Sequence, residues 1–285
     1  MSELETLLDI FNLEPIEQNI FRGISRDLGL PNLFGGQVLG QALIAAARTV
    51  DPERTAYSCH AYFLRVGDAS APVIYQVKRI RDGGSFNTRH IVAIQHGRPI
   101  FDMSASFQVP EQGFEHQDSF PEDVPEPEGL KNQRELYADE HGDLPGILAA
   151  SRPIEIRPIA PEYPRPAAPL PAASRSWFRA TEPVGDDPGL HHALLAYASD
   201  FELLVTSLLP HGVSPLRREV FVASLDHALW FHRPFRIDDW LLYDIQSPNA
   251  ASGRGLSWGR IYARDGRLVA SVAQEGLMRR RKDNG

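Results

Sequence analysis

The sequence predicts an α+β fold made of two similar units, each a long helix wrapped by a curved antiparallel sheet. Three observations support this prediction: one helix followed by four strand-like runs occurs twice, tight turns separate several of these runs, and a proline-rich segment lies between the two sets. The 285-residue chain is long enough for such a pair. We expect a first unit over residues 1–110, a connector over 111–174 and a second unit over 175–285.

The first unit begins with an acidic amphipathic segment over residues 1–15, followed by a helix rich in small residues. The turn His96-Gly97-Arg98 between two β-rich runs favours a hairpin. The elements expected in this unit are a helix from Gly36 to Val50 and strands from His60 to Arg65, Val73 to Arg81, Ser85 to Gln95 and Pro99 to Val109.

The connector holds about half of the 23 prolines, and we expect in it a short helix from Leu130 to Tyr137 and an extended piece from Pro153 to Pro158. The second unit then repeats the order of the first. Its expected elements are a helix from Pro188 to Leu208 and strands from His227 to Arg233, Trp240 to Gln246, Gly253 to Ala263 and Arg267 to Met278.

Charge and cysteine content exclude several classes of protein. The 29 Lys and Arg against 37 Asp and Glu give a net charge of −8, which argues against nucleic acid or an anionic membrane as the main partner. The single cysteine, Cys59, builds neither an internal disulfide nor a cysteine-based zinc site. Since no secretory leader and no window of roughly 20 apolar residues stand out, we expect a cytoplasmic protein without a membrane span.

Asp200 is the first candidate for chemistry. It interrupts the apolar segment from Ala193 to Val205, and apolar residues lie three and four positions away on both sides, so its carboxylate should face inward. A buried carboxylate needs partners, or its pKa rises. The alternative is a structural aspartate that bonds a backbone turn or a surface arginine. Glu202 points elsewhere and is expected to be solvated.

Two further polar side chains stand out on predicted strands. Strand alternation places Ser224 and Asp226 on one face and His227 on the other, so a hydroxyl and a carboxylate could share a pocket. Ser224 lies in no Gly-x-Ser-x-Gly pattern, which disfavours a serine hydrolase. Gln274 lies among apolar neighbours on the last strand, where its amide needs partners, as structural support or as a ligand donor.

Other sequence features exclude or suggest ligands. No phosphate loop, dinucleotide fingerprint, zinc-protease pattern or metal-binding spacing of histidines occurs, and Cys59 and His60 point to opposite strand faces. Gly35-Gly36-Gln37 opens the first helix and offers backbone amides, although close packing explains the glycines nearly as well. The run from Arg279 to Lys282 could meet an anionic ligand or a neighbouring subunit, or be a solvated tail.

Several ordered strings resemble one known family. In the second half they are Tyr197 to Phe201, Ser224 to His227, Trp230 to Phe235 and Gln274 to Gly276, and in the first half Leu33 to Val38, Phe63 to Arg65, Arg81 to Gly83 and Ala105 to Gln108. These strings resemble acyl-CoA thioesterase II over nearly the whole chain.

This resemblance implies a tandem (double) hotdog fold and hydrolysis of medium- to long-chain fatty acyl-CoA. It assigns Asp200, Ser224 and Gln274 as the catalytic set that holds the attacking water, with Ser224 at a position where bacterial relatives commonly have threonine. We expect Asp200 to act as general base, without a metal or cofactor. The resemblance also implies a homodimer or homotetramer. Arg65, Arg233 and the run from Arg279 are available for the CoA phosphates.

Two other functions stay open on the same fold. An enoyl-CoA hydratase would pair its aspartate with a histidine five residues later, but position 205 is Val205. A non-catalytic acyl-CoA binding protein would keep the fold without the chemistry. Alignment of the two units places Ala105 where Gln274 lies, so we expect one active site per chain, in the second unit.

Overall fold

The computed structural model describes all residues except 1, 27–31, 142–152, 160–167 and 282–285. In the first unit the elements are α1 (Glu3–Phe11), β1 (Glu14–Glu17), β2 (Ile20–Gly23), α2 (Gly35–Ala47), β3 (Thr55–Phe63), β4 (Val73–Asp82), β5 (Phe86–Gln95) and β6 (Arg98–Gln108). The connector contains a 3-10 turn (Pro127–Gly129), α3 (Gln133–His141) and β7 (Ile154–Pro158). The second unit contains β8 (Ala173–Ala180), α5 (Pro188–Ser199), α6 (Leu203–Thr206), a 3-10 turn (Leu209–His211), β9 (Val220–Ser224), β10 (Asp226–Phe231), β11 (Leu241–Ala251), β12 (Arg254–Ala263) and β13 (Leu268–Arg280).

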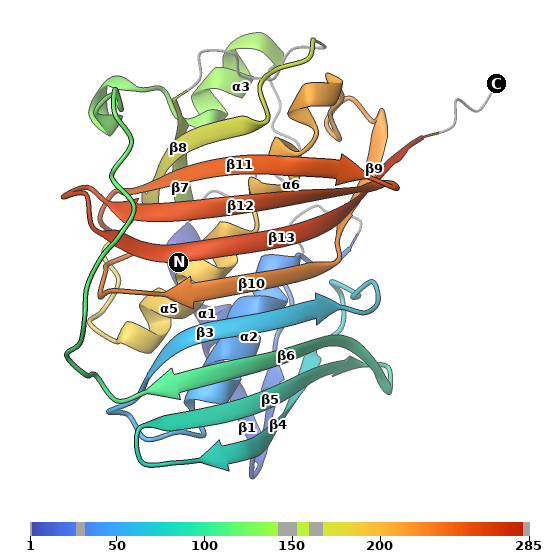
Figure 1. Ribbon diagram of the computed structural model, residues 1–285. Helices are drawn as coiled ribbons and strands as arrows, with labels where there is room; N and C mark the ends of the chain where they lie inside the picture. The colour runs from blue at the N-terminus through green and yellow to red at the C-terminus, as the bar shows by residue number, and fades with distance from the viewer. Residues whose placement is uncertain (1, 27–31, 142–152, 160–167, 282–285) are drawn as a thin grey trace.

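One antiparallel sheet runs through both units. Its strand order is β1-β2-β4-β5-β6-β3-β10-β13-β12-β11-β8-β7, and β9 pairs with β13. The order β4-β5-β6-β3 in the first unit is repeated in reverse as β10-β13-β12-β11 in the second, and β3 and β10 join the two halves at the centre (Figure 1). This is the expected tandem arrangement, with β7 of the connector added as a strand beside β8.

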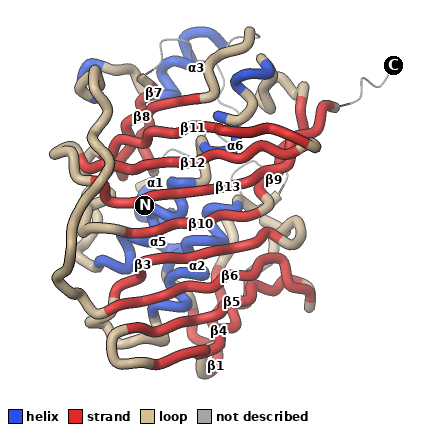
Figure 2. The backbone as a smooth tube through the Cα atoms, in the orientation of Figure 1, coloured by secondary structure: helices blue, strands red, loops and turns tan. Residues whose placement is uncertain are grey.

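The two long helices lie together on one side of this sheet (Figure 2). Glycines let α2 and α5 approach closely: a Cβ on Gly36 would lie 2.5 Å from the Tyr197 carbonyl oxygen, and one on Gly40 would lie 2.8 Å from that of Ala193. As the residue number rises on α2 it falls on α5, so the helices run antiparallel. The N-terminus of α2 therefore meets the C-terminus of α5, and this junction positions the candidate site.

Local sequence signals explain several element boundaries. Ser2 and Glu5 form a capping box at the start of α1, whose residues Leu4, Leu7 and Phe11 are buried. His96 and Gly97 both have positive φ, 49° and 70°, as the predicted hairpin turn between β5 and β6 requires.

The second long helix differs from the sequence prediction. A helix from Pro188 to Leu208 is expected, but α5 ends at Ser199 and α6 begins only at Leu203. The segment Pro188–His211 as a whole is long and apolar enough to cross a membrane, although no such segment is expected from the sequence. However, 78% of its most apolar window is buried inside the chain, as in the core helix of a folded domain.

Candidate active site

Asp200 lies at the junction of the two units, directly after the last residue of α5. It is the C-cap of that helix, with φ −83° and ψ −4°, and the next N–H, of Phe201, donates to the Ala198 carbonyl in a tightened last turn. The side chain turns toward the start of α2, where a Cβ on Gly35 would lie 2.7 Å from Asp200 Oδ2. Only glycine lets the backbone of α2 approach the carboxylate this closely.

Three donors surround the Asp200 carboxylate, which is 4% exposed. Gln274 Nε2 lies 2.6 Å from Oδ1, Ser224 Oγ lies 3.3 Å from the same oxygen, and the Gly36 N–H donates from the first turn of α2. The predicted set of Asp200, Ser224 and Gln274 is thus together in one place, on α5, β9 and β13. The partners of Asp200 are therefore two side chains and a helix-start amide, and not the backbone turn or surface arginine of a purely structural aspartate.

Burial and hydrogen bonding act on Asp200 in opposite directions. Burial raises the pKa of the Asp200 carboxyl from 3.8 to about 6, while hydrogen bonds from Gln274, Gly36 and Ser224 partly offset this rise. At neutral pH most of the carboxyl is therefore ionised, yet it binds a proton more readily than an exposed aspartate. A group with this pKa is suited to accept a proton from water.

Aromatic rings pack together where the start of α2 meets the end of α5. Phe34 stacks on Phe201 with ring centroids 4.7 Å apart, and Tyr197 meets both rings edge to face. The Phe63 ring lies so near the start of α2 that a Cβ on Gly35 would be 2.9 Å from it. Burial at this junction is the physical cause of the raised pKa of Asp200.

A bulge between β9 and β10 contradicts the predicted strand faces. Gly276 of β13 pairs with Ser224, but Ala273 pairs with Ala228, so four residue steps on one strand match three on the other. The extra residue reverses the alternation. Ser224 and His227 therefore face the site together, whereas Asp226 does not share the pocket as expected and instead accepts from the Glu275 N–H at 2.7 Å.

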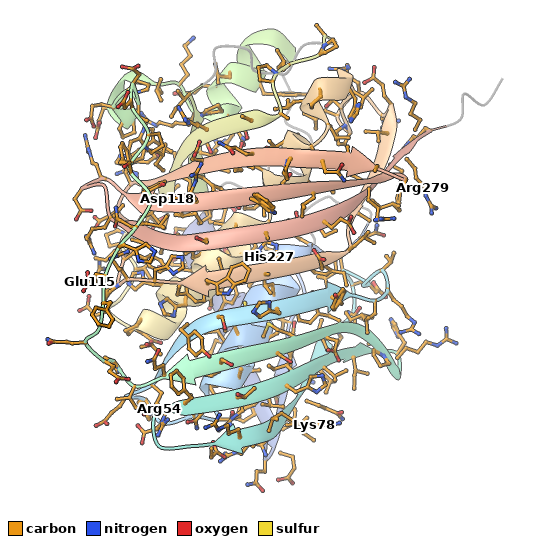
Figure 3. All side chains as sticks on the ribbon, in the orientation of Figure 1. Arg54, Lys78, Glu115, Asp118, His227 and Arg279 are labelled. Atoms are coloured by element: carbon orange, nitrogen blue, oxygen red, sulfur yellow. The ribbon has the colours of Figure 1, made fainter. Side chains whose placement is uncertain are left out.

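His227 was expected outside the site and lies within it. Its side chain is 0% exposed, Nδ1 is 3.2 Å from Gln274 Nε2 and 3.9 Å from Asp200 Oδ1, and Nε2 is 3.0 Å from Ser199 Oγ. Burial lowers the pKa of the imidazole to about 3, so the ring is neutral. Figure 3 shows His227 at the centre of the sheet, on β10. The sequence shows His227 three positions after Ser224, but it does not show the bulge that turns the imidazole toward the site.

Glu202 is buried, contrary to the prediction that it is solvated. Because α5 ends at Ser199, Glu202 leaves the helical phase on which the prediction rests. Its carboxylate accepts hydrogen bonds from Ser176 Oγ of β8 and, at 2.9 Å, from Gln133 Nε2 of α3. Glu202 therefore fixes the turn that follows Asp200 to the sheet and to the connector.

The first unit carries the same bulge without the polar side chains. On β3, two residue steps from Ala56 to Ser58 match one step on β6, and Cys59 three positions after Ala56 lies opposite Ala105. In the second unit Ser224 occupies the place of Ala56, His227 that of Cys59, and Gln274 that of Ala105. The alignment of Ala105 with Gln274 therefore agrees with the sheet register.

The arginines predicted as candidates for binding the CoA phosphates differ in exposure and in hydrogen-bond partners. Arg65 donates to the Pro99 carbonyl oxygen and Arg233 to that of Leu268, so both guanidinium groups have partners within the chain. Arg279 is exposed at the end of β13 (Figure 3). Of the helix-start amides, the Gly36 N–H already donates to Asp200. Within the described residues, no group of three or more His, Cys, Asp and Glu could hold a metal ion.

Comparison with known proteins gives consistent results in both halves. A family model described as acyl-CoA thioesterase N-terminal domain matches residues 27–108, and one described as acyl-CoA thioesterase matches residues 152–277. The chain is 43% identical over 280 residues to acyl-CoA thioesterase 2 of Haemophilus influenzae, covering 97% of this chain and 98% of that protein. It is 41% identical over 282 residues to human acyl-coenzyme A thioesterase 8, covering 95% and 88%.

Solved structures agree in fold. An acyl-CoA thioesterase II from Mycobacterium marinum has a TM-score of 0.81 and 43% identity, covering 97% of this chain and 99% of that one. A protein described as having a hot dog fold, from Alicyclobacillus acidocaldarius, has a TM-score of 0.78 over 97% of this chain at 20% identity, a likeness of fold alone. The predicted double hotdog architecture is confirmed.

Proposed function

The chain belongs to the acyl-CoA thioesterase II family and is a thioester hydrolase, and on that premise we propose that Asp200, Ser224 and Gln274 hydrolyse medium- to long-chain fatty acyl-CoA. One observation carries the assignment of the site. It is a buried carboxylate with a raised pKa, held by a hydroxyl and an amide at the junction of the two units.

In the proposed reaction Asp200 takes a proton from a water molecule as the water oxygen attacks the thioester carbonyl carbon. The tetrahedral intermediate then collapses, the bond from carbon to sulfur breaks, and the proton held by Asp200 passes to the departing CoA thiolate. The products are a free fatty acid and CoA, and Asp200 is again ionised. Ser224 and Gln274 orient the water and the carboxylate.

The N-terminus of α2 is the proposed source of oxyanion stabilisation. The first N–H groups of a helix have no partner within the helix, and the helix dipole is positive at this end. Since the Gly36 N–H donates to Asp200, the N–H groups of Gly35 and Gln37 are the donors that remain in this turn. An oxyanion bound there would form beside the general base.

An apolar acyl chain fits the surroundings of the carboxylate. The rings of Phe34, Phe63 and Phe201 supply an apolar wall, and each buried methylene contributes about 0.8 kcal/mol to binding. The preference for medium to long chains rests on the family resemblance. Self-association into a dimer or tetramer is a prediction of the same resemblance, and light scattering after gel filtration would test it. A cytoplasmic location is a prediction from the cysteine content and the lack of a recognisable leader or membrane-length window in the sequence.

The hydratase alternative needs an aspartate and a histidine that both reach the substrate. His227 is near Asp200, but it is fully buried behind Gln274 and neutral, so it offers no proton to a bound enoyl group. An acyl-CoA binding protein without catalysis would not need a buried carboxylate of raised pKa. The geometry therefore favours the hydrolase.

The test is thiol release from saturated acyl-CoAs, from butyryl-CoA to stearoyl-CoA, by the unmodified chain and by Asp200→Asn. We expect a loss of kcat of about 100-fold or more with KM nearly unchanged, as for removal of a general base. Asp226→Asn is the matched control, because Asp226 is a carboxylate two residues after Ser224 that faces away from the site and accepts from the Glu275 N–H. Normal turnover by folded Asp200→Asn would refute the role of Asp200, and hydration of an enoyl-CoA without thiol release would favour the hydratase.

A further inference from the structure

The orientation of the Gln274 amide is critical for the proposed site. The two ends of an amide have nearly the same size, so only their partners decide which end faces the carboxylate. With Nε2 toward Asp200 Oδ1, at 2.6 Å, the pair attracts; with Oε1 there, two acceptors would meet. Gln274 is 2% exposed, so bulk water does not supply compensating partners. A second buried group that accepts from Nε2 would hold the amide in this same orientation.

His227 lies where such a group is needed. Its Nδ1 is 3.2 Å from Gln274 Nε2, and its Nε2 is 3.0 Å from Ser199 Oγ. The imidazole is fully buried and neutral, so one ring nitrogen carries a proton and the other accepts. Which nitrogen accepts determines whether Gln274 can donate to the ring.

The backbone of α5 settles this choice. Ser199 Oγ lies 3.0 Å from the carbonyl oxygen of Ala196, which can only accept, so the hydroxyl proton of Ser199 is directed there. The oxygen of Ser199 then accepts the Nε2 proton of His227, which leaves Nδ1 bare. Gln274 donates one Nε2 hydrogen to Nδ1 and directs the other at Asp200 Oδ1 at 2.6 Å, with Ser224 Oγ 3.1 Å away. A carbonyl of the helix thus sets the direction of the hydrogen bonds from Ser199 through His227 to Gln274.

The first unit offers an internal comparison. Its bulge is the same, but Cys59 stands at the place of His227 and Ala105 at the place of Gln274. The histidine and the glutamine are present together in one unit and absent together in the other. This pattern is expected if the imidazole serves the amide, rather than the packing of the sheet.

We propose that His227 is a positioning residue that, through Ser199, holds the Gln274 amide with its NH₂ group toward Asp200. It does not act as acid or base, because it is 0% exposed and 3.9 Å from the carboxylate oxygen. This inference rests on the proposed function of Asp200 and Gln274 and adds a requirement to it: a neutral imidazole with the proton on Nε2.

The first test is the tautomer itself, read by ¹⁵N NMR of the full chain labelled at histidine, with the His227 signal assigned by its loss in His227→Asn. We expect a protonated Nε2 and a bare Nδ1 from pH 6 to pH 8. A protonated Nδ1, or an imidazolium in that range, overturns the proposal. This readout does not depend on catalysis, so it separates failure of the positioning role from failure of the proposed function.

The second test is a double-mutant cycle on thiol release. His227→Leu removes the acceptor, and we expect kcat to fall about tenfold with KM unchanged, and no further fall when it is added to Gln274→Ala. His227→Asn places an amide oxygen near the position of Nδ1 and should keep most of the turnover. Normal turnover in His227→Leu, or losses that multiply with those of Gln274→Ala, would mean that His227 does not act through the amide. If His227→Leu does not fold, the ¹⁵N NMR measurement of the His227 tautomer alone decides whether the proposal holds.

Discussion

Replacing Asp200 by asparagine should remove a pH-dependent cost to folding as well as activity. In the unfolded chain this carboxyl ionises with a pKa near the ordinary 3.8, and in the folded chain burial raises its pKa to about 6. The folded state therefore binds the proton more tightly. The resulting stability is fully present below pH 3.8 and is lost as the pH rises through about 6.

The two pKa values give the size of the effect. Integrating the proton linkage between pH 4 and pH 8 gives a loss of about 2–3 kcal/mol in the free energy of unfolding from this one group. Asparagine has no charge to bury, so Asp200→Asn should lack this loss. A changed hydrogen bond to Gln274 or Gly36 shifts the variant by a constant amount and does not alter the slope.

Urea unfolding of both chains at several pH values measures the difference directly. Every other titratable group contributes equally to both, so subtracting one curve from the other isolates Asp200. The variant should gain about 2–3 kcal/mol relative to the unmodified chain between pH 4 and pH 8. Parallel curves would show that Asp200 ionises normally in the folded chain and would refute the argument for a buried general base.

Further outcomes are expected from the same geometry. Because Asp200 must be ionised to accept a proton, kcat/KM should fall below about pH 6 and be about tenfold below its plateau at pH 5. Ser224→Ala should lower kcat about tenfold, whereas Ser224→Thr keeps the hydroxyl and should retain the kcat of the unmodified chain. Equal losses of kcat in the two variants would contradict a role for the oxygen. Gly36→Ala should cost about 1–3 kcal/mol in urea unfolding, since its Cβ would lie 2.5 Å from the Tyr197 carbonyl oxygen. Cys59 is 0% exposed and burial raises its thiol pKa to about 12, so a thiol reagent at pH 8 should label it only on unfolding, and rapid labelling of the native chain would contradict its burial.

The two-unit fold could be predicted because the sequence signals for its helices, strands and turns are local. The repeated order of elements, the His96-Gly97 turn and the small residues of the first long helix all follow from short-range conformational preferences. The importance of Asp200 was also visible, since a carboxylate in an apolar segment needs partners wherever that segment packs. Residue type left the roles of Ser224 and Gln274 open, and the family resemblance named them as partners of Asp200.

The positions of Asp226, His227 and Glu202 could not be predicted in this way. Alternation along a strand is local, but the bulge that reverses it at the end of β9 exists only in the pairing with β13. The prediction for Glu202 failed because it extended a helical phase past Ser199, where the helix ends.

The sequence by itself determined which chemical groups this protein has, and in which unit they lie: Asp200, Ser224 and Gln274 all come from the second half of the chain. Only the tertiary structure decided what surrounds them. The close antiparallel packing of α2 and α5 brings the Gly36 N–H of the first unit to Asp200 of the second, and the bulge turns His227 toward Gln274. The physical reason is that the direction in which a side chain points, its burial and its pKa all arise from contacts between segments far apart in the chain. Periodicity within a single segment does not encode these contacts.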